Sequence, residues 1–344
     1  MSGEVSNITE IATKVSDEIF KFFRWETLPI KDQNFQCNKT DIHKKSKGHE
    51  THPVDVVFHY DDPYLNKTIY LNTDLKSYSK GSIEYKKGVI KTLNSLAQTI
   101  DCAQGSSEWR KRYVLKKGNY EIRGLLFIYN WDQKCDSDFL EKLGKHKLDN
   151  LPLTKRSIIH ILDPARILYL YRIVSDVIKL KDNNEFPKDD NYWFHYPDQI
   201  LHKPRGDKIK HPATIETMCS PYMVIEHGPI KNYNYKEGKV EEVSGPGFVI
   251  YYNQEGKTYQ EFLYLFDILS RLQILRDDVT IKIRIAHISP NEDLKSNFKK
   301  AINNYVSDWG FDQYRENDLN RIDVEVVQLA APNYNPGILA WREQ

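Results

Sequence analysis

The fold is constrained most by two apolar runs of strand length, at 120–131 (YEIRGLLFIYNW) and at 157–162 (SIIHIL). A strand with one face in solvent alternates apolar and polar residues, whereas a nearly continuous apolar run is typical of a strand buried on both faces. Strands of this kind lie in sheets that are covered by helices on both sides. We therefore expect an α/β fold with a central sheet.

Other segments supply the remaining parts of such a fold. Apolar residues at three- and four-residue steps predict a helix that begins near Ile8 and ends before Pro29. Two β-type runs follow at 54–60 and 68–78, and a crossover helix is expected at about 83–102. A further helix from Pro164 should close this first domain near residue 181.

The chain is long enough for two domains, since it has 344 residues and single domains mostly run to ~100–200 residues. We expect domains at 1–181 and 191–344, with the charged stretch 181–190 as a linker or as a surface loop within one domain. The second part should be a further α/β domain, because strands expected at 247–252, 279–285 and 322–329 alternate with helices at about 259–275 and 292–309. Its last strands should be parallel.

Charge and hydropathy limit the classes of function. The net charge is only +1, so contact with nucleic acid must come from a local basic patch. No stretch approaches the ~18 apolar residues of a membrane span, and the first twenty residues lack the apolar run of a signal peptide. We expect a cytoplasmic protein that has no membrane partner.

The four cysteines, Cys37, Cys102, Cys135 and Cys219, are scattered and include no CxxC pair. This pattern argues against a zinc ribbon, a redox motif or a disulfide framework, and it favours reduced thiols. The segment 37–52 also carries several histidines. It has no apolar periodicity, so we interpret it as a solvated polar loop in preference to a metal site.

Chemistry is concentrated in the motif NTDLKSY at 72–78. Side chains alternate across a strand, so Asp74 and Lys76 should project from one face while Leu75 points to the other. Asp55 is the polar residue between Val54 and Val56 on the preceding run, and it can face the same site. Two carboxylates suit Mg²⁺, which polarises a phosphate and lowers the pKa of an attacking water.

A structural ion pair on a solvated edge strand is the alternative, because a DxK tripeptide is short. Placement on a strand, the upstream carboxylate and the order of the elements favour a catalytic site instead.

At these residues the sequence resembles the PD-(D/E)XK nuclease superfamily, with Pro53-Val54-Asp55 followed after eighteen residues by Asp74-Leu75-Lys76. The resemblance covers roughly residues 6–181 and implies a restriction-endonuclease-like αβββαβ core with a mixed sheet. It further implies metal ligation by Asp55, Asp74 and the carbonyl of Leu75, with Lys76 as the catalytic lysine. The first motif has Val before its Asp, and the second has Asp in place of Glu.

Two further residues match positions that vary within the superfamily. Many members add a glutamate from the first helix, for which Glu18 is the best match here as a metal ligand, although Glu18 also suits a solvated helix face. Gln98 lies on the crossover helix, where some members carry a polar active-site residue, but we favour its interpretation as an ordinary residue of the helix surface.

Basic residues gather next to the proposed site. Between Lys76 and Lys117 there are ten Lys and Arg residues against three acids. This excess could hold a phosphate backbone, with Tyr78, Tyr85 and Trp109 available for stacking, or it could simply be a solvated face. The expected nucleic-acid-binding residues are Lys80, Lys86, Lys87, Arg110, Lys111 and Arg112.

These features predict a Mg²⁺- or Mn²⁺-dependent endonuclease that hydrolyses phosphodiester bonds of DNA, with RNA as an alternative substrate. The chain resembles nuclease subunits of bacterial antiphage defence systems, and its C-terminal domain should recognise substrate, a partner or a trigger. The competing hypothesis is a catalytically silent nuclease-fold subunit that binds nucleic acid or a partner protein of a defence complex. A homo-oligomer is equally compatible with the sequence.

Overall fold

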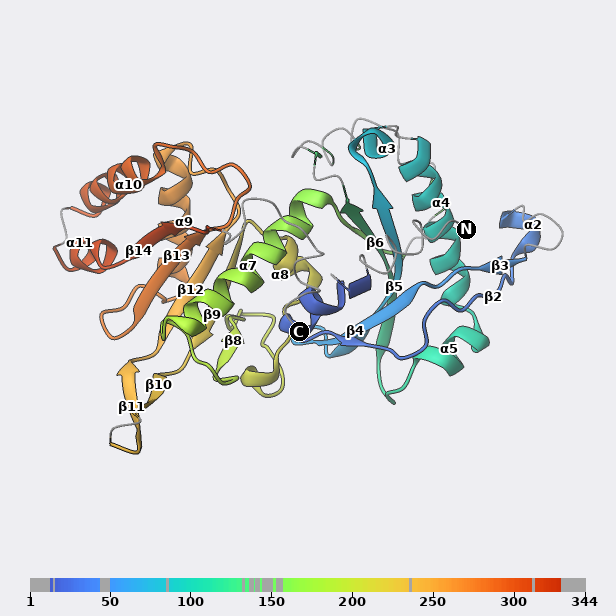
Figure 1. Ribbon diagram of the computed structural model, residues 1–344, viewed down its shortest axis with the longest axis horizontal. Helices are drawn as coiled ribbons and strands as arrows, with labels where there is room; N and C mark the ends of the chain where they lie inside the picture. Colours follow the sequence, from blue (N-terminus) through green and yellow to red (C-terminus); the bar gives the residue numbers. More distant parts are fainter. Residues whose placement is uncertain are drawn as a thin grey trace. The chain divides into compact units, whose positions relative to one another are not determined.

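The computed structural model describes residues 13–14, 16–43, 50–84, 87–131, 134–135, 139, 143, 151–152, 157–234, 237–310 and 313–328. The chain divides into two compact units, of which the first reaches Leu168 and the second begins at Tyr169. Each unit has its own five-stranded sheet (Figure 1).

The sheet of the first unit is mixed, in the order β1-β4-β5-β6-β7. β1, β4 and β5 are antiparallel to one another in turn, whereas β5, β6 and β7 are parallel. The strands are β1 (Glu26–Thr27), β4 (Val56–Asp62), β5 (Lys67–Tyr78), β6 (Tyr120–Asn130) and β7 (Ile159–Leu162). β6 is buried over nearly its whole length, as its apolar run predicts.

Three helices connect the parallel strands β5 and β6, namely α3 (Lys80–Glu84), α4 (Lys87–Ala103) and α5 (Ser107–Tyr113). α4 is amphipathic, and its buried residues recur at helical spacing through Val89, Leu93, Leu96 and Ile100. They pack with one face of the sheet in a single core, to which the strands contribute Val57, Tyr70, Ile122, Leu126 and Ile128. The crossover helix expected from the sequence is therefore present.

The opposite face of the sheet is covered by the first helix, of which residues 16–22 are described. Phe20 on this helix packs edge-on against Phe58 of β4 and Phe127 of β6, with ring centroids 4.7 and 6.0 Å away. Phe127 is paired with Leu75 in the strand register. The first helix thus lies over the face of Leu75, while the alternate residues of β5 face α4.

A small substructure precedes β4. β2 (Phe35–Gln36) and β3 (Thr51–His52) form a two-stranded antiparallel sheet, and the short helix α2 (Thr40–His43) lies between them in the sequence. The chain then enters β4 through residues 53–55. Strands of two residues bury little by themselves, so this substructure depends on side-chain contacts with the rest of the unit.

The second unit has the mixed sheet β14-β13-β12-β9-β8, in which β12, β13 and β14 are parallel, as expected. Its strands are β8 (Tyr192–Phe194), β9 (Tyr222–His227), β12 (Gly247–Tyr252), β13 (Thr280–Ile285) and β14 (Asp323–Val326), with a separate hairpin of β10 (Ile230–Asn234) and β11 (Lys239–Ser244). Its helices are α7 (Pro164–Asp182, from Tyr169 onward), the 3-10 helix η2 (Lys208–Lys210), α8 (Ile215–Cys219), α9 (Tyr259–Arg271), α10 (Leu294–Asp308) and α11 (Gln313–Asn320). α9 and α10 share one apolar core with this sheet.

The division at Leu168 precedes the boundary expected near residue 181. From Tyr169 onward, α7 contacts the second sheet, where the Tyr169 hydroxyl donates a hydrogen bond to the Tyr251 carbonyl and Asp176 pairs with Arg284. Residues 181–190, expected as a linker or as a surface loop within one domain, lie within the second unit, where Glu185 pairs with Lys282. Helical periodicity shows where α7 runs, but not which sheet it packs against.

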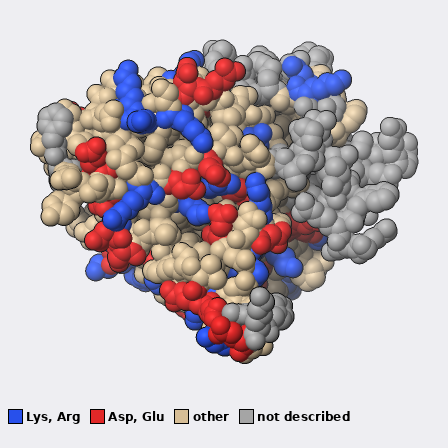
Figure 2. Space-filling model, turned by 60° about the vertical axis from the view of Figure 1, so that its left-hand side comes forward, with Lys and Arg blue, Asp and Glu red and all other residues tan. Residues whose placement is uncertain are grey.

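The α/β architecture with an N-terminal mixed sheet is confirmed. On the face drawn in Figure 2, basic and acidic side chains are interspersed. Among the described residues, no helix is both long enough and apolar enough to cross a membrane.

Candidate metal and catalytic site

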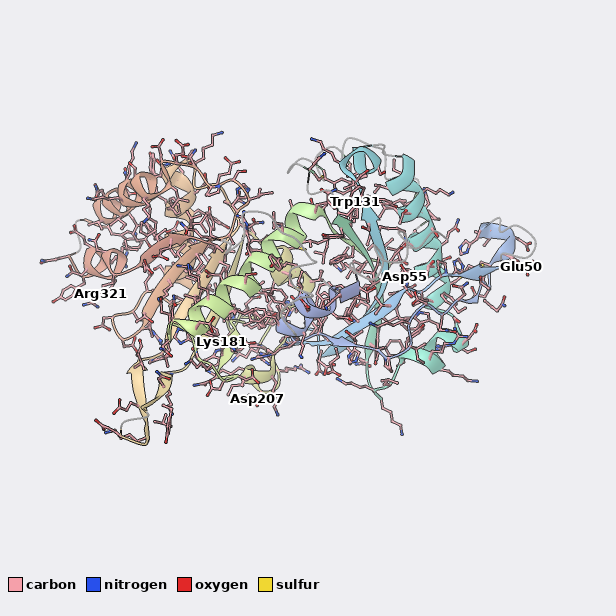
Figure 3. All side chains as sticks on the ribbon, viewed as in Figure 1. Glu50, Asp55, Trp131, Lys181, Asp207 and Arg321 are labelled. Atoms are coloured by element: carbon pink, nitrogen blue, oxygen red, sulfur yellow. The ribbon has the colours of Figure 1, made fainter. Side chains whose placement is uncertain are left out.

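The strand register brings Asp55 to Asp74. Val56, the first residue of β4, is paired with Thr73 of β5, so the residue before Val56 lies opposite the residue after Thr73. Asp55 itself lies in a bend just ahead of β4, and not within a strand as expected from the sequence. The backbone N–H of Asp32 donates a hydrogen bond to the Asp55 carbonyl at 2.9 Å, which holds this bend in place. Figure 3 shows Asp55 beside the N-terminal sheet.

The side chain of Asp55 reaches across to β5. Its Oδ2 accepts a hydrogen bond from the backbone N–H of Leu75 at 2.8 Å. This bond fixes one carboxylate oxygen next to the peptide that links Asp74, Leu75 and Lys76. The three residues singled out in the sequence therefore meet in one place.

The Lys76 ammonium lies among three oxygen atoms. Its Nζ pairs with Asp74 Oδ1, and it lies 3.4 Å from the Leu75 carbonyl oxygen and 3.9 Å from Asp55 Oδ2. The side chains of Asp74, Asp55 and Lys76 are 13%, 27% and 31% exposed. Asp74, Leu75 and Asp55 are the ligands that the sequence resemblance implies for a metal. The Lys76 ammonium therefore lies close to the same oxygen atoms that would bind a metal cation.

Burial perturbs both charged partners. Removal from water raises the pKa of Asp74 to about 6, an effect that the neighbouring ammonium opposes and that repulsion by Asp55 reinforces. Burial alone would lower the pKa of Lys76, but attraction by Asp74 and Asp55 outweighs it, and the pKa of Lys76 is raised. Carboxyl groups whose pKa is raised by burial next to a charged partner are found both at functional sites and in structural ion-pair networks.

The donor set suits a hard divalent cation. Two carboxylates and a backbone carbonyl offer oxygen atoms only, as Mg²⁺ and Mn²⁺ prefer, and Asp55 and Asp74 are partly open to solvent, which leaves room for metal-bound water. A divalent charge would also relieve the repulsion between the two partly buried carboxylates. The residues present therefore fit such a metal.

A buried hydrogen bond supports β5 beside the site. Trp109 of α5 is fully buried and donates from Nε1 to Asn72 Oδ1 at 3.0 Å. Asn72 is two residues before Asp74, on the same face of the strand. Trp109, considered above as a stacking residue for nucleic acid, is instead part of the core.

Glu18 lies on the first helix, over the face of the sheet that carries Leu75. Asp74 and Lys76 project from the other face, toward α4, where Tyr78 and Thr92 are in contact through their hydroxyl groups at 3.2 Å. A metal-binding role for Glu18 stays a prediction.

The expected nucleic-acid-binding residues do not form one group. Lys80 begins α3, just beyond the C-terminal end of β5, whereas α5 packs beside Tyr70 and Asn72 toward the other end of the strand (Figure 1). On α5, Arg112 pairs with Glu108 and donates to the Asn34 carbonyl, so its guanidinium is held by the protein itself.

Two other basic residues of α5, Arg110 and Lys111, are exposed. Lys86 and the side chain of Lys87 lie outside the described residues. Binding of nucleic acid by this basic set remains a prediction.

Sequence reasoning missed a second group of side chains, formed by Cys37, His43, His52 and Cys102. The histidines were interpreted as part of a solvated loop and the cysteines as scattered thiols, yet all four side chains are buried together. The spacing of Cys37, His43 and His52 was the available signal. Cys102 comes from α4, and only the fold brings it to the others.

Comparison with known proteins found one match, to the first part of the chain. Residues 1–166 match a family described as the GAPS4 protein PD-(D/E)XK nuclease domain. The comparisons with curated proteins and with solved structures found no match. The matched range ends two residues before the division between the units and contains Asp55, Asp74 and Lys76.

Proposed function

We propose that the chain is a metal-dependent nuclease that hydrolyses phosphodiester bonds of DNA, since its residues 1–166 match the family of GAPS4 protein PD-(D/E)XK nuclease domains. The observation that carries the proposal is the convergence of Asp55, Asp74 and the Leu75 carbonyl around the Lys76 ammonium. GAPS4 is an antiphage system, so we place the activity in defence against phage.

Each residue has a defined part in the proposed reaction. Asp55, Asp74 and the Leu75 carbonyl would hold Mg²⁺ or Mn²⁺, which polarises the scissile phosphate and lowers the pKa of the attacking water. The Leu75 N–H orients the Asp55 carboxylate through the bond at 2.8 Å. Lys76 positions the water and offsets negative charge that develops on the phosphate.

The protonation of Lys76 depends on the same carboxylates. Asp74 and Asp55 raise its pKa against the effect of burial. Lys76 must release these oxygens before they bind a cation, and burial then favours loss of its proton. The lysine would thereby become able to accept a proton from the attacking water at its Nζ.

Cleavage of supercoiled plasmid in Mg²⁺ or Mn²⁺ tests the proposal. Nicked or linear product from the circular substrate requires endonucleolytic cutting, and parallel reactions on linear DNA and on RNA determine the substrate class. Lys76→Ala and Asp74→Ala should each lower the rate at least ~100-fold. Lys67→Ala on the same strand is the matched control, because Lys67 is exposed and pairs with Glu121 outside the site.

Unchanged cleavage in both site variants would show that the activity comes from elsewhere. If the wild type cuts none of these substrates with either metal, even when bacterial lysate or a partner is supplied, the silent-subunit hypothesis is favoured instead.

For the second unit we propose recognition of substrate, a partner protein or a trigger, within the bacterial cytoplasm. This unit has its own sheet and its own apolar core, so it can carry a binding surface separate from the nuclease site. Sedimentation of the full chain with and without DNA would distinguish a homo-oligomer from a monomer that needs another protein.

A further inference from the structure

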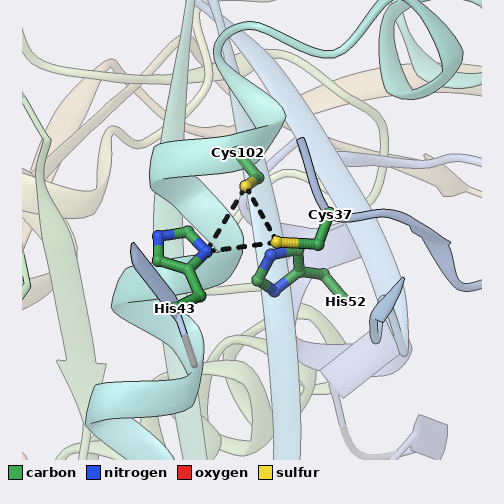
Figure 4. A group of neighbouring side chains, drawn as sticks. All are labelled: Cys37, His43, His52 and Cys102. Carbon is green, nitrogen blue, oxygen red and sulfur yellow. Dashed lines mark hydrogen bonds between the residues drawn. The ribbon is translucent and has the colours of Figure 1, made fainter. Parts of the chain in front are cut away.

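Four metal-ligating side chains converge in the first unit, away from the carboxylate site. Cys37, His43, His52 and Cys102 each offer one ligand atom, and these atoms all lie within 4.8 Å of one another. Figure 4 shows the two sulfur atoms and the two imidazole rings directed toward a common centre. None of the four side chains is more than 8% exposed.

The distances among Cys37 Sγ, Cys102 Sγ and His43 Nδ1 agree with three edges of a tetrahedral zinc site, and the fourth ligand atom, from His52, lies within 4.8 Å of each of them. Zinc bonds of about 2.3 Å to sulfur and about 2.0–2.1 Å to nitrogen place two sulfur ligands about 3.8 Å apart, and sulfur and nitrogen about 3.6 Å apart. The two sulfur atoms are separated by 3.7 Å, and His43 Nδ1 lies 3.4 Å from Cys37 Sγ and 3.5 Å from Cys102 Sγ. A disulfide would need a separation of about 2.05 Å, and both cysteines are free.

Hydrogen bonds set the tautomer of His43. Its Nε2 lies 3.2 Å from Asp101 Oδ2. A carboxylate only accepts hydrogen bonds, so Nε2 carries the proton and the lone pair of Nδ1 faces the two sulfur atoms. Lys39 in turn holds Asp101 at 2.8 Å. A carboxylate behind a ligating histidine is a recurrent feature of zinc sites.

A similar argument applies to His52. The Thr99 hydroxyl donates to the Ser95 carbonyl at 2.9 Å, so its oxygen is left to accept from His52 Nδ1, which is 3.4 Å away. A neutral ring then carries its proton on Nδ1 and a lone pair on Nε2. Both histidines are therefore held in a tautomer that can ligate.

We propose that Cys37, His43, His52 and Cys102 form a structural zinc site of the Cys2His2 type. Sulfur and imidazole nitrogen in tetrahedral arrangement select Zn²⁺ over Mg²⁺, which prefers oxygen. Two thiolates and two neutral imidazoles balance the charge of Zn²⁺, so the buried site is neutral overall. Binding forms two Zn–S and two Zn–N bonds, and each thiol releases its proton to solvent.

The site has a clear structural purpose. Cys37 directly follows β2, His43 ends α2 and His52 ends β3. The two-residue strands β2 and β3 are too short to hold this substructure by themselves, and Cys102 comes from the last turn of α4. Zinc would tie this substructure to the crossover helix. His52 is three residues before Asp55, so the same tie would steady the bend that presents the proposed metal-binding carboxylate.

Metal analysis of the full chain, produced without a histidine tag or added zinc, tests the site independently of nuclease activity. Wild type should contain about one zinc per chain, and zinc replaced by Co²⁺ should give the visible absorption of a tetrahedral thiolate complex. Cys102→Ser should lose zinc and the cobalt spectrum. Cys219→Ser is the matched control, because this thiol lies in the second unit, and it should retain both.

Stability supplies a second measurement. Loss of zinc should lower the thermal midpoint of the first unit by at least about 5 °C. If Cys102→Ser fails to fold, Cys102→His provides a second test. This variant replaces the sulfur ligand with a nitrogen ligand and should still bind the metal. Wild-type protein that holds no zinc and gives no cobalt–thiolate spectrum would overturn the proposal, as would recovery of a Cys37–Cys102 disulfide from freshly isolated protein. If the protein contains zinc but does not cleave DNA, the proposed zinc site is supported and only the proposed nuclease activity is contradicted.

Discussion

Acidification from pH 7 to pH 5 should weaken binding of a divalent metal at Asp55 and Asp74 about tenfold. Burial raises the pKa of Asp74 to about 6. At this pKa the carboxyl is about nine-tenths ionised at pH 7 and about one-tenth ionised at pH 5. Only the ionised form binds the metal, so the apparent affinity should follow the ionised fraction and level off above pH 7.

Titration with Mn²⁺ at several pH values, with free Mn²⁺ measured by electron paramagnetic resonance, checks this magnitude. Mn²⁺ prefers oxygen ligands and so reports on the carboxylates in preference to the Cys and His group. Asp74→Asn provides the control. It should bind more weakly at pH 7 and lose most of the pH dependence, because the titrating group has been removed.

An equal affinity at pH 5 and pH 7 would refute the reasoning. Asp74 would then titrate near its ordinary value of 3.8, which would mean that attraction by Lys76 outweighs burial. In the structure, burial of Asp74 has a larger effect on its pKa than attraction by Lys76, since the Asp74 side chain is only 13% exposed.

The same shift affects folding when no divalent metal is bound. Between pH 3.8 and about 6 the folded chain holds a proton on Asp74 that the unfolded chain has lost. Stability from this group is therefore fully present below pH 3.8 and declines as pH rises through about 6. The whole difference corresponds to about 3 kcal/mol at about 1.4 kcal/mol per pH unit. Urea unfolding of wild type and Asp74→Asn at pH 4 and pH 7 measures this effect. The difference in unfolding free energy between the two proteins should change between the two pH values.

Two pairs of substitutions in the second unit test its packing through denaturant unfolding. Gly247→Ala would place a Cβ atom 2.7 Å from the backbone of β13 and should lower the unfolding free energy by about 1–3 kcal/mol. In the control Gly245→Ala the added Cβ meets no atom within 4 Å, so the unfolding free energy should change by less than about 1 kcal/mol. Asp176→Ala leaves the buried Arg284 without its main partner and should cost about 3–5 kcal/mol, while Asp278→Ala removes an exposed ion pair and should stay within about 0.5 kcal/mol. Equal effects within either pair would contradict the packing described here.

The sequence by itself determined much of the local structure and the residue pattern of the candidate site. β6 and β12 lie within a residue of their expected bounds, because continuous apolar runs mark strands that are buried on both faces. Asp74 and Lys76 share a face because strand side chains alternate, whatever the rest of the fold does. Asp55 departs locally, since it lies in a bend ahead of its strand, and so does the expected polar loop, which contains α2 and β3 and buries His43 and His52.

Tertiary structure decided what no local pattern contains. In the tertiary structure, α7 from Tyr169 onward belongs to the second unit, and Arg112 forms an ion pair with Glu108. Cys102 lies next to Cys37, His43 and His52, which precede β4 in the sequence. It also placed Lys76 among three oxygen atoms and buried Asp74 enough to raise its pKa. The physical reason is that periodicity records which face of an element is apolar, whereas partners and burial depend on how distant segments pack.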